Sequence, residues 1–172
     1  RTIMPTATFD NVDLARLHQL AEAMTGLFPP QLVIGLVGTL GAGKTTFTQA
    51  LAAAAGVDPD EVTSPTFTLL CSYDATIAAG PIRLHHLDAY RLSDEDEFLE
   101  LGVEELFESE NSWVLIEWAD RMRSVLPVRT LWITIDIEAS MQQPSPDRKI
   151  SFVTDDKDVE PLLALLVDRI SG

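Results

Sequence analysis

Hydrophobic positions recur at helical spacing in some segments of this chain and without that spacing in others. The segments with helical spacing are predicted to be helices. Apolar residues recur at helical spacing over residues 10–25, 45–55 and 159–170. Gly26 and Gly56 follow the first two of these segments, where glycine commonly ends a helix. The sequence therefore predicts helices near both ends of the chain and one between them.

Other segments are apolar and β-branched without helical spacing, which is typical of strands. A further, acidic helix is expected to begin at Ser93, because three acids follow it where the helix dipole favours negative charge. A polar, proline-containing loop is expected at 140–147. The predicted strands are residues 32–37, the second part of 62–73, 82–90, 113–117, 130–137 and 149–153.

The net charge of the chain limits the classes of molecule that it is expected to bind. The 172 residues carry 12 basic and 27 acidic side chains, a formal net charge of −15. Such a protein repels nucleic-acid phosphates and anionic membranes, so we expect it to bind neither nucleic acid directly nor membranes. With a single cysteine, Cys71, expected in the core, no apolar run of membrane-spanning length and no signal peptide, we expect a cytoplasmic protein.

A phosphate-binding loop is the clearest motif. Residues 38–45, GTLGAGKT, match G-x-x-x-x-G-K-[ST] and lie between a predicted strand and a predicted helix. Glycines let backbone N–H groups surround an anion, Lys44 can reach the terminal phosphates, and the Thr45 hydroxyl suits Mg²⁺. We expect ATP and Mg²⁺ as cofactors. The predicted nucleotide contacts are Gly38, Gly41, Ala42, Gly43, Lys44, Thr45 and Thr46.

This motif predicts the fold class. Strand, glycine turn and helix in that order are typical of an α/β, P-loop NTPase-like fold, with a central sheet flanked by helices in three layers. We find no internal repeat and no linker, so we expect one domain over residues 1–172.

Phosphate-loop chemistry also needs a carboxylate to complete the magnesium site and to aim a water molecule. Two acids are candidates. Glu117 ends the apolar strand WVLI, and Asp88 ends the less apolar run LHHL. Of the adjacent His85 and His86, at most one can face the site, because side chains alternate along a strand, and no zinc site is expected.

Four blocks together resemble the TsaE family, small bacterial P-loop ATPases of tRNA threonylcarbamoyladenosine biosynthesis. The blocks are GTLGAGKTTF (38–47), SPTFTL (64–69), HLDAYRL (86–92) and VLIEWADR (114–121). The resemblance implies slow, partner-stimulated, Mg²⁺-dependent ATP hydrolysis that supports modification of adenosine 37 in tRNA. It implies the TsaD and TsaB proteins as partners, with tRNA reached only through their complex.

The resemblance also assigns roles to residues. Lys44, Asp88 and Glu117 would be catalytic, and Thr45 and Glu117 would hold the metal. Arg148 would lie near the nucleotide, Trp118 at the partner surface, and residues 64–66 would form the loop that senses the nucleotide. Thr39 stands where the family usually has an acid, and Asp147 precedes Arg148 where it usually has glycine.

Three other functions use the same loop. A small-molecule kinase is the main alternative, to which Arg121 and Arg123 could contribute, although no arginine-rich stretch of lid length occurs. A GTPase normally needs N-K-x-D, and no Asn-Lys pair occurs in the chain. A nucleotide-gated binding module would not need both Asp88 and Glu117.

Overall fold

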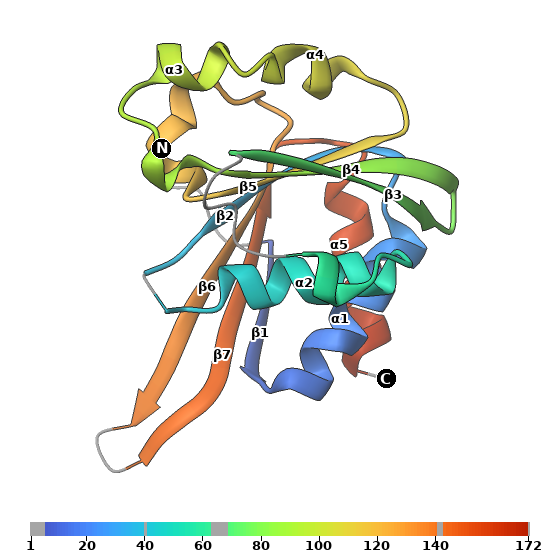
Figure 1. The fold of residues 1–172 in the computed structure, drawn as a ribbon. Coiled ribbons are helices and arrows are strands. Elements are labelled where there is room, and N and C mark those ends of the chain that lie inside the picture. The colour runs from blue at the N-terminus through green and yellow to red at the C-terminus, as the bar shows by residue number, and fades with distance from the viewer. Residues whose placement is uncertain (1–5, 40, 63–68, 141–142, 172) are drawn as a thin grey trace.

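The computed structural model describes residues 6–39, 41–62, 69–140 and 143–171. These residues form one seven-stranded sheet in the order β1-β7-β6-β2-β5-β4-β3 (Figure 1). The strands are β1 (Ala7–Val12), β2 (Gln31–Val37), β3 (Leu70–Ile77), β4 (Gly80–Asp88), β5 (Ser112–Glu117), β6 (Leu131–Ser140) and β7 (Gln143–Thr154).

The middle of the sheet is parallel and its margins are antiparallel. Strand β2 pairs in parallel with β5 and β6, and β4 pairs in parallel with β5. Strand β3 pairs antiparallel with β4 at one margin, and β6, β7 and β1 are antiparallel at the other. The carboxyl ends of β2, β4 and β5 therefore meet at one edge of the sheet, which is where ligands bind in such folds.

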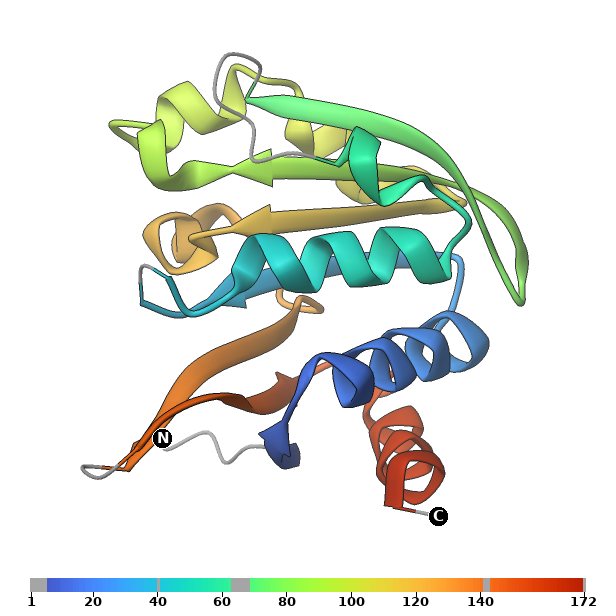
Figure 2. The ribbon, with the colours of Figure 1, turned by 60° about the horizontal axis from the view of Figure 1, so that its bottom comes forward.

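Helices cover both faces of the sheet, as Figures 1 and 2 show. One face carries α1 (Leu14–Leu27), α2 (Lys44–Ala54) and α5 (Glu160–Ser171), and the other carries α3 (Glu95–Leu99) and α4 (Val103–Glu108). Short 3₁₀ helices η1 (Pro59–Glu61), η2 (Ala89–Arg91) and η3 (Ala119–Val125) connect other elements. The predicted three-layer, P-loop NTPase-like α/β fold is thus confirmed.

The strand pattern explains the two faces. Along β5, Trp113 and Leu115 belong to the core cluster beneath α1 and α2, whereas Val114 and Ile116 belong to the cluster beneath α3 and α4. A parallel strand buried on both faces needs a continuous apolar run, and residues 113–116 supply one. Among the described residues, no helix has the length and apolar character that crossing a membrane requires.

Two predicted boundaries were wrong because long-range pairing overrode the local pattern. The first helix begins at Leu14, since residues 7–12 pair with β7 instead, and the Asp13 side chain accepts a hydrogen bond from Arg16 N at 2.8 Å. The loop expected at 140–147 is mostly strand, because β7 begins at Gln143 and pairs with β6. Among the described residues, strand β1 pairs with β7 only as far as Arg148, so Pro144 lies beyond that pairing, where proline is tolerated.

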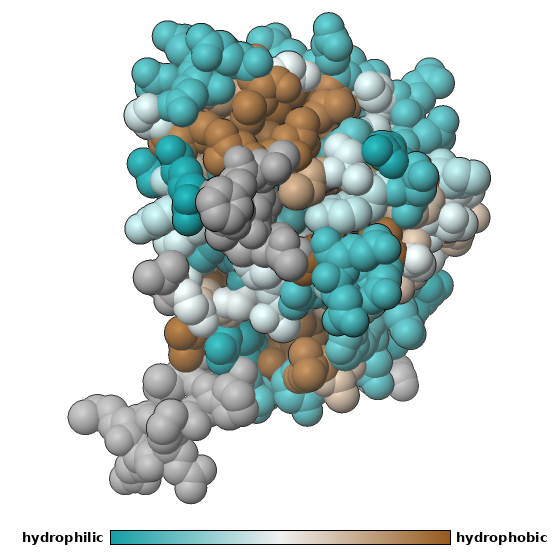
Figure 3. Space-filling view, viewed as in Figure 1, coloured by the Kyte–Doolittle hydropathy of each residue, from teal (hydrophilic) through white to brown (hydrophobic). Residues whose placement is uncertain are grey.

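The acidic helix and the cysteine also differ from expectation. The acidic segment forms two short helices, and Gly102, at φ 78°, begins the second of them. Asp94 caps α3 through a hydrogen bond from Glu97 N at 2.9 Å. This segment lies along the hydrophilic upper margin of Figure 3, above an apolar area of the same face. Cys71 is only half-buried rather than in the core, because β3 is an edge strand.

Candidate active site

The phosphate loop connects β2 to α2 at the carboxyl edge of the sheet. Gly41 and Gly43 adopt φ values of +80° and +107°, which L-residues with a side chain rarely adopt. Gly38 is required for a different reason. A Cβ there would lie 2.5 Å from the carbonyl oxygen of Ile135 on β6. The glycines of the motif thus serve both the turn and its close approach to the sheet.

Helix α2 presents an open N-terminus to this loop. Its first position follows Gly43, and among the described residues no side chain caps it. The first N–H groups of a helix have no partner within the helix, and they carry the positive end of its dipole. This arrangement is suited to binding a phosphate.

Lys44 is held inside the loop in this structure. The residue is 5% exposed, and Nζ donates to the carbonyl oxygens of Gly38 at 2.7 Å and Thr39 at 2.9 Å. Nζ also lies 3.9 Å from the ring centroid of Trp118. Burial lowers the pKa of Lys44, and the negative charges of Glu117, Asp120 and Asp88 oppose that shift. The ammonium thus lies at the loop, with carboxylates nearby.

Glu117 links the loop to the sheet. It ends β5, is 3% exposed, and its Oε1 accepts a hydrogen bond from the Thr45 hydroxyl at 3.0 Å. Its other oxygen, Oε2, lies 2.5 Å from Nε2 of His86 on β4. Both oxygens of this buried carboxylate therefore have a partner.

Asp88 lies beside Glu117. The two residues are register partners at the ends of the parallel strands β4 and β5. Asp88 Oδ1 accepts a hydrogen bond from Tyr90 N at 2.9 Å. Burial raises the pKa of Asp88, and the charge of Glu117 raises it further, whereas the hydrogen bond from Tyr90 N lowers it. The structure thus brings together the two acids that the sequence singled out.

Trp118 takes an unusual backbone conformation next to these acids. Its φ of 59° is left-handed, which is uncommon for a bulky residue. The indole is half-buried over Lys44, and its centroid lies 4.9 Å from that of Tyr90. Arg121 donates to the Tyr90 carbonyl oxygen at 2.8 Å. Trp118 lines a pocket together with residues of the phosphate loop, and its expected position at a partner surface stays a prediction.

These side chains line one pocket of about 400 Å³. Its floor is the phosphate loop and the start of α2, and its walls come from the ends of β4 and β5. The lining residues are Gly41, Gly43, Lys44, Thr45, Thr46, Asp88, Tyr90, Arg91, Glu117 and Trp118.

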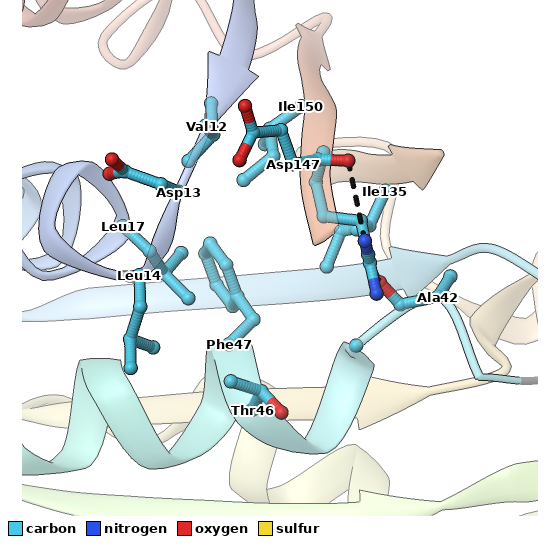
Figure 4. A pocket seen from close by; sticks show the side chains of 12 residues that line it. Val12, Asp13, Leu14, Leu17, Ala42, Thr46, Phe47, Ile135, Asp147 and Ile150 are labelled. Carbon is cyan, nitrogen blue, oxygen red and sulfur yellow. Dashed lines mark hydrogen bonds between the residues drawn. The ribbon is translucent and has the colours of Figure 1, made fainter. Parts of the chain in front are cut away.

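A second pocket, of about 220 Å³, adjoins the opposite side of the phosphate loop. Figure 4 shows apolar side chains from α1, α2 and the strands around it, with Thr46 at its base. Arg148 lines this pocket and its Nε donates to the Ala42 carbonyl oxygen at 2.7 Å. The two pockets share Gly43 and Thr46. The apolar lining comprises Val12, Leu14, Leu17, Phe47, Ile135 and Ile150.

The residue types suit magnesium but not a fully protein-bound metal. Mg²⁺ in nucleotide sites takes one or two protein oxygens and otherwise waters and phosphate oxygens. The Thr45 hydroxyl and the Glu117 carboxylate, 3.0 Å apart at the phosphate loop, form such a donor pair. Among the described residues, no three His, Cys, Asp or Glu side chains gather into a metal site.

The sequence identified some of these residues and missed others. Residues 64–66, the expected nucleotide-sensing loop, lie outside the described residues. His86 was not distinguished from His85, although it shares the parity of Asp88 along β4 and so had to face the same side. The second pocket was missed because its walls come from distant parts of the chain.

Comparisons with known proteins point to one family. A family model described as "Threonylcarbamoyl adenosine biosynthesis protein TsaE" matches residues 12–150. The chain is 40% identical over 107 residues to the tRNA threonylcarbamoyladenosine biosynthesis protein TsaE of Treponema pallidum, covering 62% of this chain and 74% of that protein. It is 39% identical over 116 residues to that of Bacillus subtilis, covering 67% and 68%.

A solved structure agrees with these sequence matches. The crystal structure of Bacillus subtilis YdiB matches with a TM-score of 0.74 at 27% identity, covering 98% of this chain and 97% of that one. The likeness extends over the whole fold, beyond the phosphate loop.

Proposed function

Because the chain belongs to the threonylcarbamoyl adenosine biosynthesis TsaE family, we propose that it is a magnesium-dependent ATPase that supports threonylcarbamoyladenosine formation in tRNA. One observation carries the proposal. The phosphate loop lies at the same edge of the sheet as Asp88 and Glu117, and Glu117 accepts a hydrogen bond from Thr45 of that loop.

The phosphates of ATP would occupy the pocket in front of α2. The amide groups of the loop and the open N-terminus of α2 would bind their oxygens. Lys44 would exchange its two carbonyl partners, Gly38 and Thr39, for the β- and γ-phosphates. The carbonyl oxygens hold the Lys44 ammonium at the loop, so it would move only a short distance to reach the phosphates.

Thr45 and Glu117 would hold the magnesium ion. When bound, the ion would neutralise charge on the β- and γ-phosphates. The Thr45 hydroxyl already donates a hydrogen bond to Glu117 Oε1, which leaves its oxygen lone pairs available to a cation. Glu117 would thereby fix the direction of the hydroxyl.

Asp88 would orient the water molecule that attacks the γ-phosphate. Its Oδ1 is occupied by the N–H of Tyr90, which leaves Oδ2 to accept a proton from water. The residue is buried next to Glu117, so the ends of β4 and β5 would keep the water away from bulk solvent.

The nucleoside would enter the pocket shown in Figure 4. This pocket adjoins the loop at Gly43 and Thr46, so one ligand can extend from it to the phosphate site. Its apolar walls suit a flat aromatic base. Arg148, anchored on the carbonyl oxygen of Ala42, would lie beside the nucleotide.

The partners would be proteins. A net charge of −15 opposes direct binding to tRNA, so we propose that the chain acts on the TsaD–TsaB complex and reaches tRNA only through it. Hydrolysis by the isolated chain would be slow, and the complex would stimulate it. We further propose that residues 1–172 act as one domain in the cytoplasm.

The test is an ATPase assay on the isolated chain, with TsaD and TsaB added, and then with tRNA added. We expect slow phosphate release that requires Mg²⁺ and rises when both proteins are present. A rate that the complex leaves unchanged would contradict the proposed role. Phosphorylation of a metabolite at the expense of ATP would support the small-molecule kinase instead.

A further inference from the structure

His86 is a buried histidine that the chemistry above does not use. Its side chain is fully buried, at 0% exposure, and Nε2 lies 2.5 Å from Glu117 Oε2. Within the described part of the chain, its other ring nitrogen, Nδ1, is buried without a hydrogen-bond partner. A polar ring in such surroundings calls for an explanation, because an unpaired buried nitrogen carries a free-energy cost.

Strand register explains how His86 reaches the acid. In the parallel pair of β4 and β5, His86 is opposite Leu115 and Asp88 is opposite Glu117. His86 and Asp88 are two residues apart and so share a face of β4, whereas His85 points to the other face. His85 accordingly makes a different contact, from Nδ1 to the Ser72 hydroxyl at 2.7 Å.

The contact with Glu117 determines which ring nitrogen of His86 carries the hydrogen. The carboxylate of Glu117 accepts, so Nε2 carries the hydrogen. Nδ1 then exposes only a lone pair, which is less costly to bury unpaired than an N–H group would be. The ring therefore offers Glu117 one donor, held in place by the sheet.

We propose that His86 is a positioning residue for the magnesium site. By occupying Oε2 of Glu117, it holds the carboxylate in the orientation in which Oε1 accepts from the Thr45 hydroxyl. Without that donor, Oε2 would be a buried oxygen with no partner, and the carboxylate would turn away from Thr45. Removing a hydrogen-bond partner of a metal-ligating side chain typically lowers metal affinity 10–100-fold.

This inference rests on the proposed function. It is tested by measuring how much Mg²⁺ increases the affinity of the protein for a nucleotide. The affinity of a non-hydrolysable ATP analogue is measured by calorimetry with and without Mg²⁺ for wild type, His86→Leu and His86→Gln. We expect His86→Leu to reduce the gain in affinity that Mg²⁺ gives by about tenfold or more, with the magnesium-free affinity unchanged. Gln can place an N–H near the Nε2 position, so His86→Gln should restore most of the gain.

His85→Leu is the matched control, since it makes the same change one residue away on the other face of β4. It should retain the wild-type magnesium gain. A full gain in His86→Leu, or an equal loss in His85→Leu, would overturn the inference while leaving the proposed function intact. If Mg²⁺ does not change the nucleotide affinity of the wild-type protein, the inference and the proposed function are both overturned.

A measurement on the nucleotide-free protein keeps the inference testable if His86→Leu does not fold. Nitrogen-15 NMR should assign to His86 a ring with hydrogen on Nε2 and none on Nδ1, and His86→Gln should remove that signal. Its chemical shift should move in Glu117→Gln and stay unchanged in His85→Gln. A His86 ring without hydrogen on Nε2 would contradict the proposed contact.

Discussion

The hydroxyl of Thr45 donates to Oε1 of Glu117 at 3.0 Å, although 72 positions separate the two residues. The bond joins the start of α2 to the end of β5, so the phosphate loop and the sheet edge form one unit. In the proposed function this pair holds the magnesium ion.

Thr45→Val should remove the hydroxyl while keeping the shape of the side chain. We expect magnesium-dependent turnover to fall by about 100-fold, which corresponds to about 2.7 kcal/mol, because an oxygen ligand of the ion is lost. Phosphate-release assays over a range of Mg²⁺ concentrations measure this. Thr45→Ser keeps the oxygen and should stay near wild type, and similar losses in both variants would exclude the hydroxyl as the cause.

Lys44→Met should keep the stem of the side chain beneath Trp118 and remove the charge. The proposed ion pair with the terminal phosphates would be lost, so affinity for ATP should fall by about tenfold or more. Titration calorimetry with ATP measures the change. Lys44→Arg keeps the charge and serves as the control, and unchanged ATP affinity in Lys44→Met would refute the assignment.

Asp88→Asn should separate binding from turnover. The amide cannot accept a proton from water as a carboxylate does, so kcat should fall by about 100-fold or more while ATP affinity stays the same. Asp74→Asn on the edge strand β3 is the matched control, since its carboxylate pairs with Arg83 on the exposed surface. A normal kcat in Asp88→Asn would show that another group orients the water.

The parts of the site with local sequence signals were predictable. Glycines at required turns and the buried strand 113–117 predicted the phosphate loop and the position of Glu117. Asp88 followed from its place at a strand end, and the parallel pairing of β4 with β5 then brought it beside Glu117.

The rest depended on contacts between distant segments. Strand β1 was missed because its extended form is stabilised by β7, more than 130 residues away. The half-buried position of Trp118 over Lys44 depends on a left-handed backbone that the residue type disfavours. The second pocket combines α1, α2, β6 and β7, which a local pattern does not relate to one another.

Gly38→Ala should destabilise the protein before any ligand binds. The new Cβ would lie 2.5 Å from the carbonyl oxygen of Ile135, so the loop or β6 would have to shift. We expect a loss of about 1–3 kcal/mol in the free energy of unfolding, the usual range for overpacking. Urea denaturation measures it, with the exposed Thr39→Ala as the control, and equal stability of the two variants would contradict the close approach.

His85 should make the stability of the protein depend on pH. Burial lowers the pKa of His85 below its ordinary value, and the positive charge of Arg83 lowers it further. The unfolded chain therefore binds a proton at a pH where the folded protein does not, so stability from this residue is complete above about pH 6.5 and decreases as pH falls toward the folded pKa. The free energy of unfolding of wild type should consequently fall more steeply between pH 7.5 and pH 5.5 than that of His85→Gln, whose side chain does not titrate. Urea denaturation at several pH values measures both slopes, and parallel curves would show that the burial of His85 has no such effect.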